Sequence, residues 1–397
     1  MSGPLTGIRV IDLTVNVLGP LAAQILGDMG ADVIKVETPD GDPMRYSGQS
    51  KHPGMASMFM NINRNKRSAI LNLKRADALA ALMRMVDTAD VLLHSLRPET
   101  AERLGIGYQA VHARNPRIVY AFAPGYRSDG PNRNRPAFDD VIQGESGIAA
   151  MLGRNGGEPR YIPMVMADKF CGHVTASAVA MALYSRERTG HGQEVVVPMM
   201  ENMLSFNLVE HLWTDFFEAD RADLGYSRMF SPHRRPYATR DGYICLLAVN
   251  DEQWRRLFEV IGRQELSHDE RFAKLQARTR HINELYSIVA DALITRPTAE
   301  WQALLDRADL PNGVVNDFSS LGENAYLKTT RFFEHYEHPT EGPMVTTAIP
   351  VQFSGTPASI RRPPPGLGEH TQTLLVEAGY SDDEINRIMA GNGAAGA

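Results

Sequence analysis

The sequence predicts an α/β fold: a large domain built on a parallel sheet, and a smaller α+β domain. Two observations carry this prediction. Residues 8–37 read as a strand, a helix and a second strand, which is the building block of a parallel sheet. From about residue 226 this alternation ends, and one strand is followed by a run of helical stretches.

Apolar spacing identifies the elements of the large domain. Ile8–Leu13 is a buried strand, and a helix opens at Gly19 and Pro20 with apolar residues at helical spacing. Gly30 ends that helix before the strand 32–37. The further elements expected are helices at 78–86 and 169–188 and strands at 91–93, 118–123 and 194–197.

The smaller domain begins with a strand at 242–249. Its helices are expected at 252–261, 282–295 and 301–308, and the chain ends with a helix at 371–378. The predicted limits are 1–205 with 330–397 for the large domain, 226–316 for the small domain, and linkers at 206–225 and 317–329.

Composition narrows the class of protein. The chain has 397 residues, 43% hydrophobic and 22% charged, which allows two domains with real cores. Its net charge of −6 argues against nucleic acid as a partner. The two cysteines, Cys171 and Cys245, suit a reducing compartment. With no signal peptide and no membrane span in sight, we expect a cytoplasmic protein.

Several common chemical motifs are missing from the sequence. It has no Walker A motif, no G-x-G-x-x-G and no G-x-S-x-G. His335 and His338 flank Glu337 in a Pro-rich stretch, and we interpret them as solvated loop histidines. No His, Cys and Asp cluster has metal spacing, so no metal is expected.

Asp168 is the most informative single residue. It stands just before the long helix expected from residue 169, where an Asp commonly caps the free N–H groups of the first turn. On residue pattern alone, this cap is the favoured interpretation. A carboxylate at a helix N-terminus is also held ionised by the helix dipole, and it can attack a thioester carbonyl. An ordinary Asp, with a pKa near ~3.9, is ionised at neutral pH without tuning.

A series of short segments in a fixed order decides between these possibilities. They are Gly7–Thr14, Gly19-Pro20, Gly30–Glu37, Asn65–Ser68, Leu71–Lys74, Arg97-Pro98, Glu102–Gly105, Asn115-Pro116, Asp129–Pro131, the segment around Asp168, Arg186–Gly190, Gly192-Gln193, Leu367–Thr371 and Gly379–Ser381. From Pro4 to Ile388 the chain resembles the class III CoA-transferase family, the CaiB/BaiF family. Formyl-CoA transferase, carnitine CoA-transferase and α-methylacyl-CoA racemase are members.

The resemblance implies a Rossmann-like large domain, an interlocked homodimer and a catalytic Asp168. That Asp becomes an aspartyl-CoA thioester in the family, so CoA moves from an acyl-CoA to a carboxylic acid. Covalent catalysis divides this exchange into easier steps through mixed anhydrides. The partners implied are acyl-CoA, a small carboxylic acid and a second copy of the chain. Coenzyme A enters as substrate, and no tightly bound cofactor is expected.

The resemblance also implies CoA contacts. Two departures leave the adenine end open: Thr38 stands where some members have Arg, and Ser95 stands where others have Asn. Several of these residues are equally well explained as ordinary surface charges. The CoA-binding residues expected are Val17, Leu18, Leu71, Lys74, Ser95, Leu96, Arg97 and Arg103.

Phe138 bears on the branch of the family. Racemases resembling this chain carry a His there as one of two bases, and Phe cannot move a proton. Transfer is therefore favoured over racemisation. An acyl-CoA racemase, an intramolecular CoA-shifting isomerase and a non-catalytic acyl-CoA-binding member remain the alternatives. The glycine-rich flap of formyl-CoA transferase has no counterpart between Ser231 and Asp251, so oxalate or formate is not indicated.

Arg234 and Arg235 open the small domain and are candidates for the acceptor site. The family places its active site where large and small domains meet. Arg grips a carboxylate with two parallel hydrogen bonds, so this pair could orient the anionic group of a dicarboxylic acid. A solvated linker is the simpler reading of the same residues. The identity of the acyl donor and of the acceptor stays open.

Overall fold

The computed structural model describes residues 3–154, 157–212, 225–226 and 228–391. Part of the predicted linker 206–225, residues 213–224, lies outside the described residues. The predicted domain limits themselves stay a prediction. By its contacts the chain divides into a first unit of Met1–Ala149, Arg160–Asn207 and Arg331–Ala397 and a second unit of Ala150–Pro159 and Leu208–Thr330.

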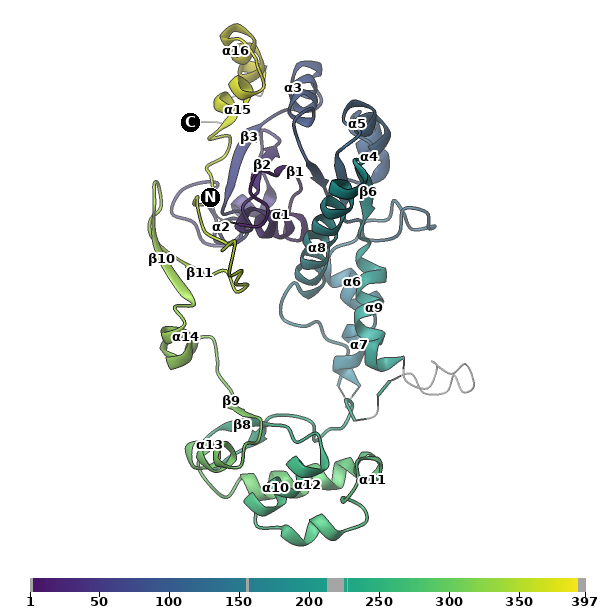
Figure 1. The fold of residues 1–397 in the computed structure, drawn as a ribbon, viewed down its shortest axis with the longest axis vertical. Helices are drawn as coiled ribbons and strands as arrows, with labels where there is room; N and C mark the ends of the chain where they lie inside the picture. The colour runs from purple at the N-terminus through teal and green to yellow at the C-terminus, as the bar shows by residue number, and fades with distance from the viewer. Residues whose placement is uncertain (1–2, 155–156, 213–224, 227, 392–397) are drawn as a thin grey trace. The chain divides into compact units, whose positions relative to one another are not determined.

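A six-stranded sheet forms the centre of the first unit (Figure 1). Its strands are β1 (Arg9–Leu13), β2 (Asp32–Glu37), β3 (Lys66–Ile70), β4 (Val91–His94), β5 (Val119–Phe122) and β6 (Gln193–Val196). All neighbours pair in parallel, in the order β3-β2-β1-β4-β5-β6. The predicted parallel sheet is confirmed. The order reverses between β1 and β4, and open sheets of this kind bind ligands beyond that point.

The helices of the first unit largely follow the apolar spacing of the sequence. The long helix begins at Met166, three residues before its predicted start, and ends at Gly190 in the left-handed conformation. The helices are α1 (Leu18–Asp28), α2 (Ser57–Asn61), α3 (Ala76–Val86), α4 (Pro98–Arg103), α5 (Tyr108–Arg114), α6 (Asp139–Glu145), α8 (Met166–Thr189), α15 (Thr371–Glu377) and α16 (Asp382–Gly391); α7 (Ile148–Gly153) and α9 (Met199–His211) each run into the second unit.

Helices cover both faces of the sheet. On one face α1 and α8 pack against strand residues such as Val10 and Val33. On the other, α3, α15 and α16 pack against Ile11 and Ile34. Successive strand residues point to opposite faces, so the continuous apolar runs of the strands supply both cores. Helices therefore form a layer on each face of the sheet.

The C-terminal part of the chain runs beside the outer strand β3. The backbone N–H of Asn65 donates to the carbonyl oxygen of Arg362 at 3.0 Å, and the N–H of His370 donates to that of Ser68 at 2.8 Å. These bonds satisfy backbone groups on an edge that would otherwise be unpaired.

The stretch around His335 and His338 is a hairpin, formed by β10 (Phe333–His338) and β11 (Gly342–Thr347). Gly342 makes the turn with a φ of 73°. His338 is buried, and its Nε2 donates to the carbonyl oxygen of Pro364 at 2.9 Å. The interpretation of His338 as a solvated loop residue is therefore wrong, whereas His335 is exposed.

The second unit is a smaller α+β fold, as predicted. Its three-stranded antiparallel sheet packs against an aromatic core that includes Trp254, Phe258 and Trp301. Asn250 and Gln253 form a reciprocal capping box at the start of its first helix. The elements are β7 (Tyr237–Ala238), β8 (Tyr243–Leu246), β9 (Asn312–Val314), α10 (Asp251–Val260), α11 (Leu275–Arg280), α12 (Ile282–Leu293), α13 (Thr298–Arg307) and α14 (Ala325–Thr329).

Two kinds of feature are absent from the described residues. None of their helices is both long and apolar enough to cross a bilayer. In the same part of the chain, no group of three His, Cys, Asp or Glu residues is arranged to hold a metal ion. Both cysteines are free; Cys171 is buried and Cys245 is exposed.

Candidate active site

A cleft of about 230 Å³ opens at the switch point of the parallel sheet. Its walls come from segments that follow the carboxyl ends of β1, β4 and β5, namely residues 15–19, 95–97 and 123–125. Residues from 133 to 138, Asp168 and Met199 complete the lining. The cleft therefore lies where an open α/β sheet offers a ligand site.

Seven of the residues singled out from the sequence meet in this cleft. Five of them, at 17–18 and 95–97, follow the carboxyl ends of β1 and β4, whereas Phe138 precedes α6 and Asp168 lies in α8. The seven are Asp168, Val17, Leu18, Ser95, Leu96, Arg97 and Phe138.

Asp168 lies inside the first turn of α8, not at its cap. Val165 occupies the cap position and makes no side-chain cap hydrogen bond, so the interpretation of Asp168 as the N-cap is wrong. Among the described residues, no hydrogen bond to the Asp168 carboxylate is found. The carboxylate lines the cleft without a protein donor to compete with an incoming electrophile.

A glycine brings α8 close to the start of α1. A Cβ on Gly172, one turn after Asp168, would lie 2.9 Å from the carbonyl oxygen of Leu18. Such an approach tolerates no side chain. Gly172 thus lets Asp168 sit opposite the loop that follows β1.

The N-terminus of α8 takes its cap from another helix. Asp139, buried at the start of α6, accepts the backbone N–H of Asp168 at 3.0 Å. The other oxygen of Asp139 accepts from the Gln143 amide, and the Gln143 Oε1 accepts the N–H of Ile162 at 2.9 Å. These bonds fix both α8 and the segment that leads into it.

The environment raises the pKa of Asp168 to about 7. Burial is the largest cause, followed by the negative charges of Asp139 and Asp140. The expectation of an ordinary carboxyl that the helix dipole keeps ionised is therefore wrong. Desolvation and two neighbouring carboxylates make the Asp168 carboxylate more basic than usual.

Backbone donors lie beside this carboxylate. Val17 caps α1 without a side-chain hydrogen bond, and the N–H groups of Leu18 and Gly19 in the first turn have no acceptor within the helix. Such groups, at the positive end of the helix, can stabilise an oxyanion. The cleft therefore brings together a carboxylate and free backbone donors, an arrangement that can serve attack on an acyl group.

Arginines at the cleft were only partly foreseen. Arg135 forms an ion pair with Glu145 at 2.6 Å, whereas neither Arg97 nor Arg133 forms an ion pair among the described residues. Arg133, Arg135 and Asp139 were missed from the sequence. The one available signal was their position directly beside Phe138, which the resemblance had already drawn into the site.

Three predicted CoA-binding residues lie outside this cleft. The Leu71 side chain is fully buried in the core, and its N–H donates to the carbonyl of Glu37 at 2.9 Å, so only its carbonyl oxygen is left for a ligand. Lys74 and Arg103 are exposed. Leu71 and Lys74 follow the carboxyl end of β3, on the same sheet edge as the cleft.

Arg234 and Arg235 line a separate cleft of about 470 Å³ in the second unit. Both side chains are exposed, and neither forms an ion pair within the described residues. They lie in a hollow rather than on a featureless linker. The other lining residues are Pro236, Tyr237, Cys245, Leu246, Leu247, Tyr286, Pro311, Asn312 and Gly313.

Comparison with known proteins identifies the family of the chain. Residues 5–371 match the model of CoA-transferase family III. The Mycobacterium tuberculosis protein named "Probable fatty acyl-CoA transferase Rv3272" is 33% identical over 94% of this chain and 97% of its own length. Its crystal structure superposes with a TM-score of 0.82 at 32% identity, covering 94% of this chain and 99% of that one. The succinate–glutarate CoA-transferase of Agrobacterium fabrum is 30% identical over 94% and 95%. The chain belongs to CoA-transferase family III.

Proposed function

We propose that this CoA-transferase carries CoA as a thioester on Asp168. The observation that supports the proposal is the free carboxylate in the cleft, opposite the uncapped N-terminus of α1. Its raised pKa adds nucleophilicity, since the basic form is the attacking one.

In the proposed reaction, Asp168 forms mixed anhydrides and a thioester in turn. The Asp168 carboxylate attacks the acyl-CoA carbonyl and expels CoA thiolate, which leaves a mixed anhydride. The thiolate then attacks the aspartyl carbonyl, releases the donor acid and leaves aspartyl-CoA. The acceptor carboxylate next attacks the aspartyl-CoA carbonyl and expels CoA thiolate, which leaves a second mixed anhydride. The thiolate then attacks the acceptor's carbonyl carbon, which forms the new acyl-CoA and releases the Asp168 carboxylate.

The roles of the protein groups follow from their places. The N–H groups of Leu18 and Gly19 stabilise the tetrahedral oxyanion, while Ser95, Leu96 and Arg97 hold the pantetheine arm and its phosphates. We place Lys74 and Arg103 at the nucleotide end, as the family resemblance implies. CoA is a substrate in this scheme, and we propose no tightly bound cofactor.

The acceptor is proposed to be a small dicarboxylic acid. Relatives include a succinate–glutarate enzyme and one named succinyl-CoA–D-citramalate CoA-transferase from Chloroflexus aurantiacus, both acting on dicarboxylates by name. In this chain Arg234 and Arg235 supply two cations beside apolar walls, which suits a short chain with an anionic end. Phe138 would contact the acyl chain, and its lack of a titratable group favours transfer over racemisation.

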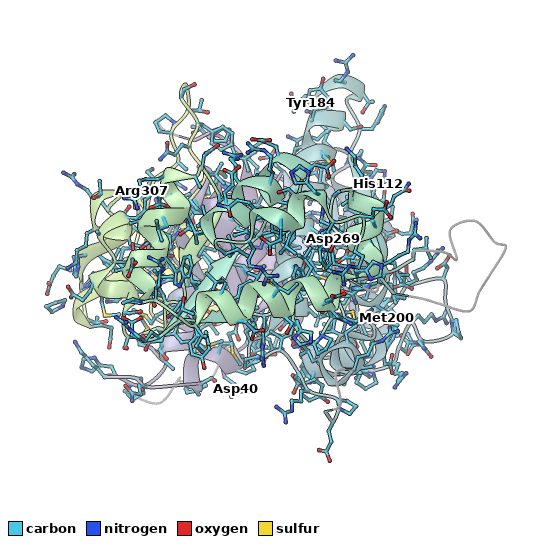
Figure 2. The ribbon with its side chains drawn as sticks, turned by 90° about the horizontal axis from the view of Figure 1, so that it is seen from below. Asp40, His112, Tyr184, Met200, Asp269 and Arg307 are labelled. Atoms are coloured by element: carbon cyan, nitrogen blue, oxygen red, sulfur yellow. The ribbon has the colours of Figure 1, made fainter. Side chains whose placement is uncertain are left out.

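We also propose an interlocked homodimer located in the cytoplasm. On α8, Met181 is 70% exposed, and Tyr184, labelled in Figure 2, is 65% exposed. A second copy could cover these side chains. Free cysteines agree with a reducing compartment. Light scattering should report about twice 43.9 kDa, and a fully active monomer would contradict the dimer.

The covalent step has a direct test. The protein is mixed with succinyl-CoA in the absence of an acceptor, and its intact mass is measured. We expect a CoA adduct on the wild type that peptide mapping assigns to Asp168 and that Asp168→Asn lacks. An adduct of equal yield on Asp168→Asn would contradict the proposal.

A further inference from the structure

A cluster of charged side chains is buried on β1, β2 and β3 and on the segment that follows β2. Lys35 pairs with Asp42 at 2.9 Å, Lys66 pairs with Asp12 at 2.9 Å, and Arg45 pairs with Glu37 at 2.7 Å. Burying ion pairs has a desolvation cost that often cancels their attraction. Stability alone is therefore a poor explanation for this cluster. The six side chains, all nearly or fully inaccessible, are Asp12, Lys35, Glu37, Asp42, Arg45 and Lys66.

Asp42 is the member that bonds to Asn16, in the loop 14–17 after β1, whose residues 15–17 line the cleft. One of its oxygens, Oδ1, accepts the backbone N–H of Asn16 at 3.1 Å and that of Met44 at 3.0 Å. The other, Oδ2, accepts from Lys35 Nζ at 2.9 Å. The N–H of Asp42 itself donates to Glu37 Oε1 at 3.0 Å. The Asp42 carboxylate thus links the buried Lys35, through Oδ2, to the loop residue Asn16, through Oδ1.

Other hydrogen bonds hold the start of the loop 14–17, at Thr14 and Val15. Asp12 Oδ1 accepts the Thr14 N–H at 2.9 Å and also the Thr14 hydroxyl. Lys35 Nζ donates to the carbonyl oxygen of Thr14 at 2.9 Å, and the Val15 N–H donates to Ser95 Oγ at 3.2 Å. Asn16 adopts a left-handed conformation with a φ of 65°, which Asn takes more readily than most non-glycine residues but which is still uncommon. Asp42 accepts the Asn16 N–H in this conformation, so the bond helps to hold it.

We infer that Asp42 is a positioning residue for CoA transfer. Its carboxylate fixes Asn16, and Asn16 sets the direction in which the chain enters α1. The N–H groups of Leu18 and Gly19 are aimed at the thioester carbonyl as a result. This inference rests on the proposed attack by Asp168, and it adds the group that aligns the oxyanion donors opposite that nucleophile.

The test compares Asp42→Asn and Asp42→Ala with Asp28→Asn as a matched control. Asp28 is also buried and pairs with Arg64 at 2.8 Å, but it lies at the far end of α1 and makes no bond to residues 14–19. The readouts are the KM for succinyl-CoA and the first-turnover rate of CoA-adduct formation at saturation. Urea unfolding of each variant reports the structural effect.

For Asp42→Ala we expect a rate at least tenfold below that of Asp28→Asn at similar stability, with KM changed less than threefold. Asp42→Asn should be partly rescued, because its amide oxygen can still accept the Asn16 N–H. A rate within twofold of the Asp28→Asn control, or an effect confined to KM, overturns the inference.

If the Asp42 variants do not fold, Ser95→Ala decides the matter. It removes the acceptor of the Val15 N–H from an exposed position. Because Ser95 is also proposed to contact CoA, the rate is read at saturating succinyl-CoA, where the loss of that contact is expected in the KM. A three- to tenfold slower adduct step at saturation is expected, and an unchanged step overturns the inference. The proposed function fails separately, by an adduct that forms on Asp168→Asn.

Discussion

The two clefts of this protein are built in opposite ways. In the first unit, buried carboxylates accept hydrogen bonds from backbone N–H groups of the segments that line the cleft of Asp168. Asp139 accepts from α8, and Asp42 accepts from the loop after β1. In the second unit, Arg234 and Arg235 project into their cleft from exposed positions, without ion pairs among the described residues.

This difference suggests a division of labour. Oxyanion donors are useful only when they need no reorganisation during the reaction, and that favours a rigid, buried support. Selection among carboxylic acids requires charge and adaptable side chains, which exposed arginines provide. We therefore expect changes in the first cleft to alter the chemical step, and changes in the second to alter substrate preference.

Replacing the nucleophile should have the largest effect. Asp168→Asn keeps the size of the side chain but removes the attacking charge, so we expect a turnover rate lower by about 10³–10⁵-fold in a folded protein. Steady-state transfer between succinyl-CoA and glutarate measures it. Asp129→Asn, an exposed substitution outside the cleft, should keep the wild-type rate. Near-normal turnover of Asp168→Asn would mean that the carboxylate is not the nucleophile.

Acidification should slow adduct formation next most strongly. With a pKa of about 7, the reactive carboxylate falls to roughly 3% of the total at pH 5.5, a loss of about 30-fold. Asp139→Asn removes a neighbouring negative charge but keeps an oxygen for the Asp168 N–H. The acidic limb of the pH–rate profile should therefore move to lower pH. Asp140→Asn should move it less, and Asp129→Asn not at all. A profile flat from pH 5.5 to 8 would rule out the raised pKa.

In the second cleft, the expected effect is on discrimination between acids. Arg234→Ala and Arg235→Ala should each raise the KM for glutarate about tenfold, the loss of a charge-assisted hydrogen bond. The KM for pentanoate, which lacks the second carboxylate, should change less than twofold. Arg240→Ala, an exposed arginine of the same unit outside this cleft, is the control. Equal effects on the KM of both acids would mean that Arg234 and Arg235 do not bind the second carboxylate.

A smaller effect is expected on stability. Since the folded-state pKa of Asp168 is raised, wild type loses stability as pH rises from about 4 to 7, where the folded state must give up its proton. Asp168→Asn avoids this loss. Allowing for partial exposure, we expect it to be more stable by about 1–2 kcal/mol at pH 8 and no different at pH 4. Urea unfolding at the two pH values measures this, and identical differences at both would contradict it.

Local patterns predicted the framework of the first unit well. The strand Asp32–Glu37 has its predicted ends, because its apolar core and the preceding glycine leave little choice. The start of α8 was placed three residues too late, because Asp139, which caps that helix, lies 29 residues earlier in the chain. A cap supplied by a distant element leaves no sign near the helix it stabilises.

The sequence predicted Asp168 as a site residue but not the buried charged residues that lie behind the cleft. Asp168 stood out through the family resemblance and lies in the cleft. Lys35 and Lys66, by contrast, are fully buried, although charged residues in a sequence normally indicate exposure. Their burial depends on Asp12 and Asp42, partners that only the folded chain brings together. The β10–β11 hairpin was missed because few of its residues are buried, so its alternation carries little apolar signal.

The bonds between β3 and the C-terminal segment also bear on how the chain is made. Asn65 and Arg362 are joined by backbone hydrogen bonding across almost 300 residues of sequence. During synthesis the chain emerges N-terminal end first, so the outer edge of β3 stays uncovered until residues 362–370 leave the ribosome. An unpaired strand edge is a template for association with other chains. A nascent chain that stalls before this point would expose such an edge, and chaperone protection would matter most for truncated products that end before Arg362.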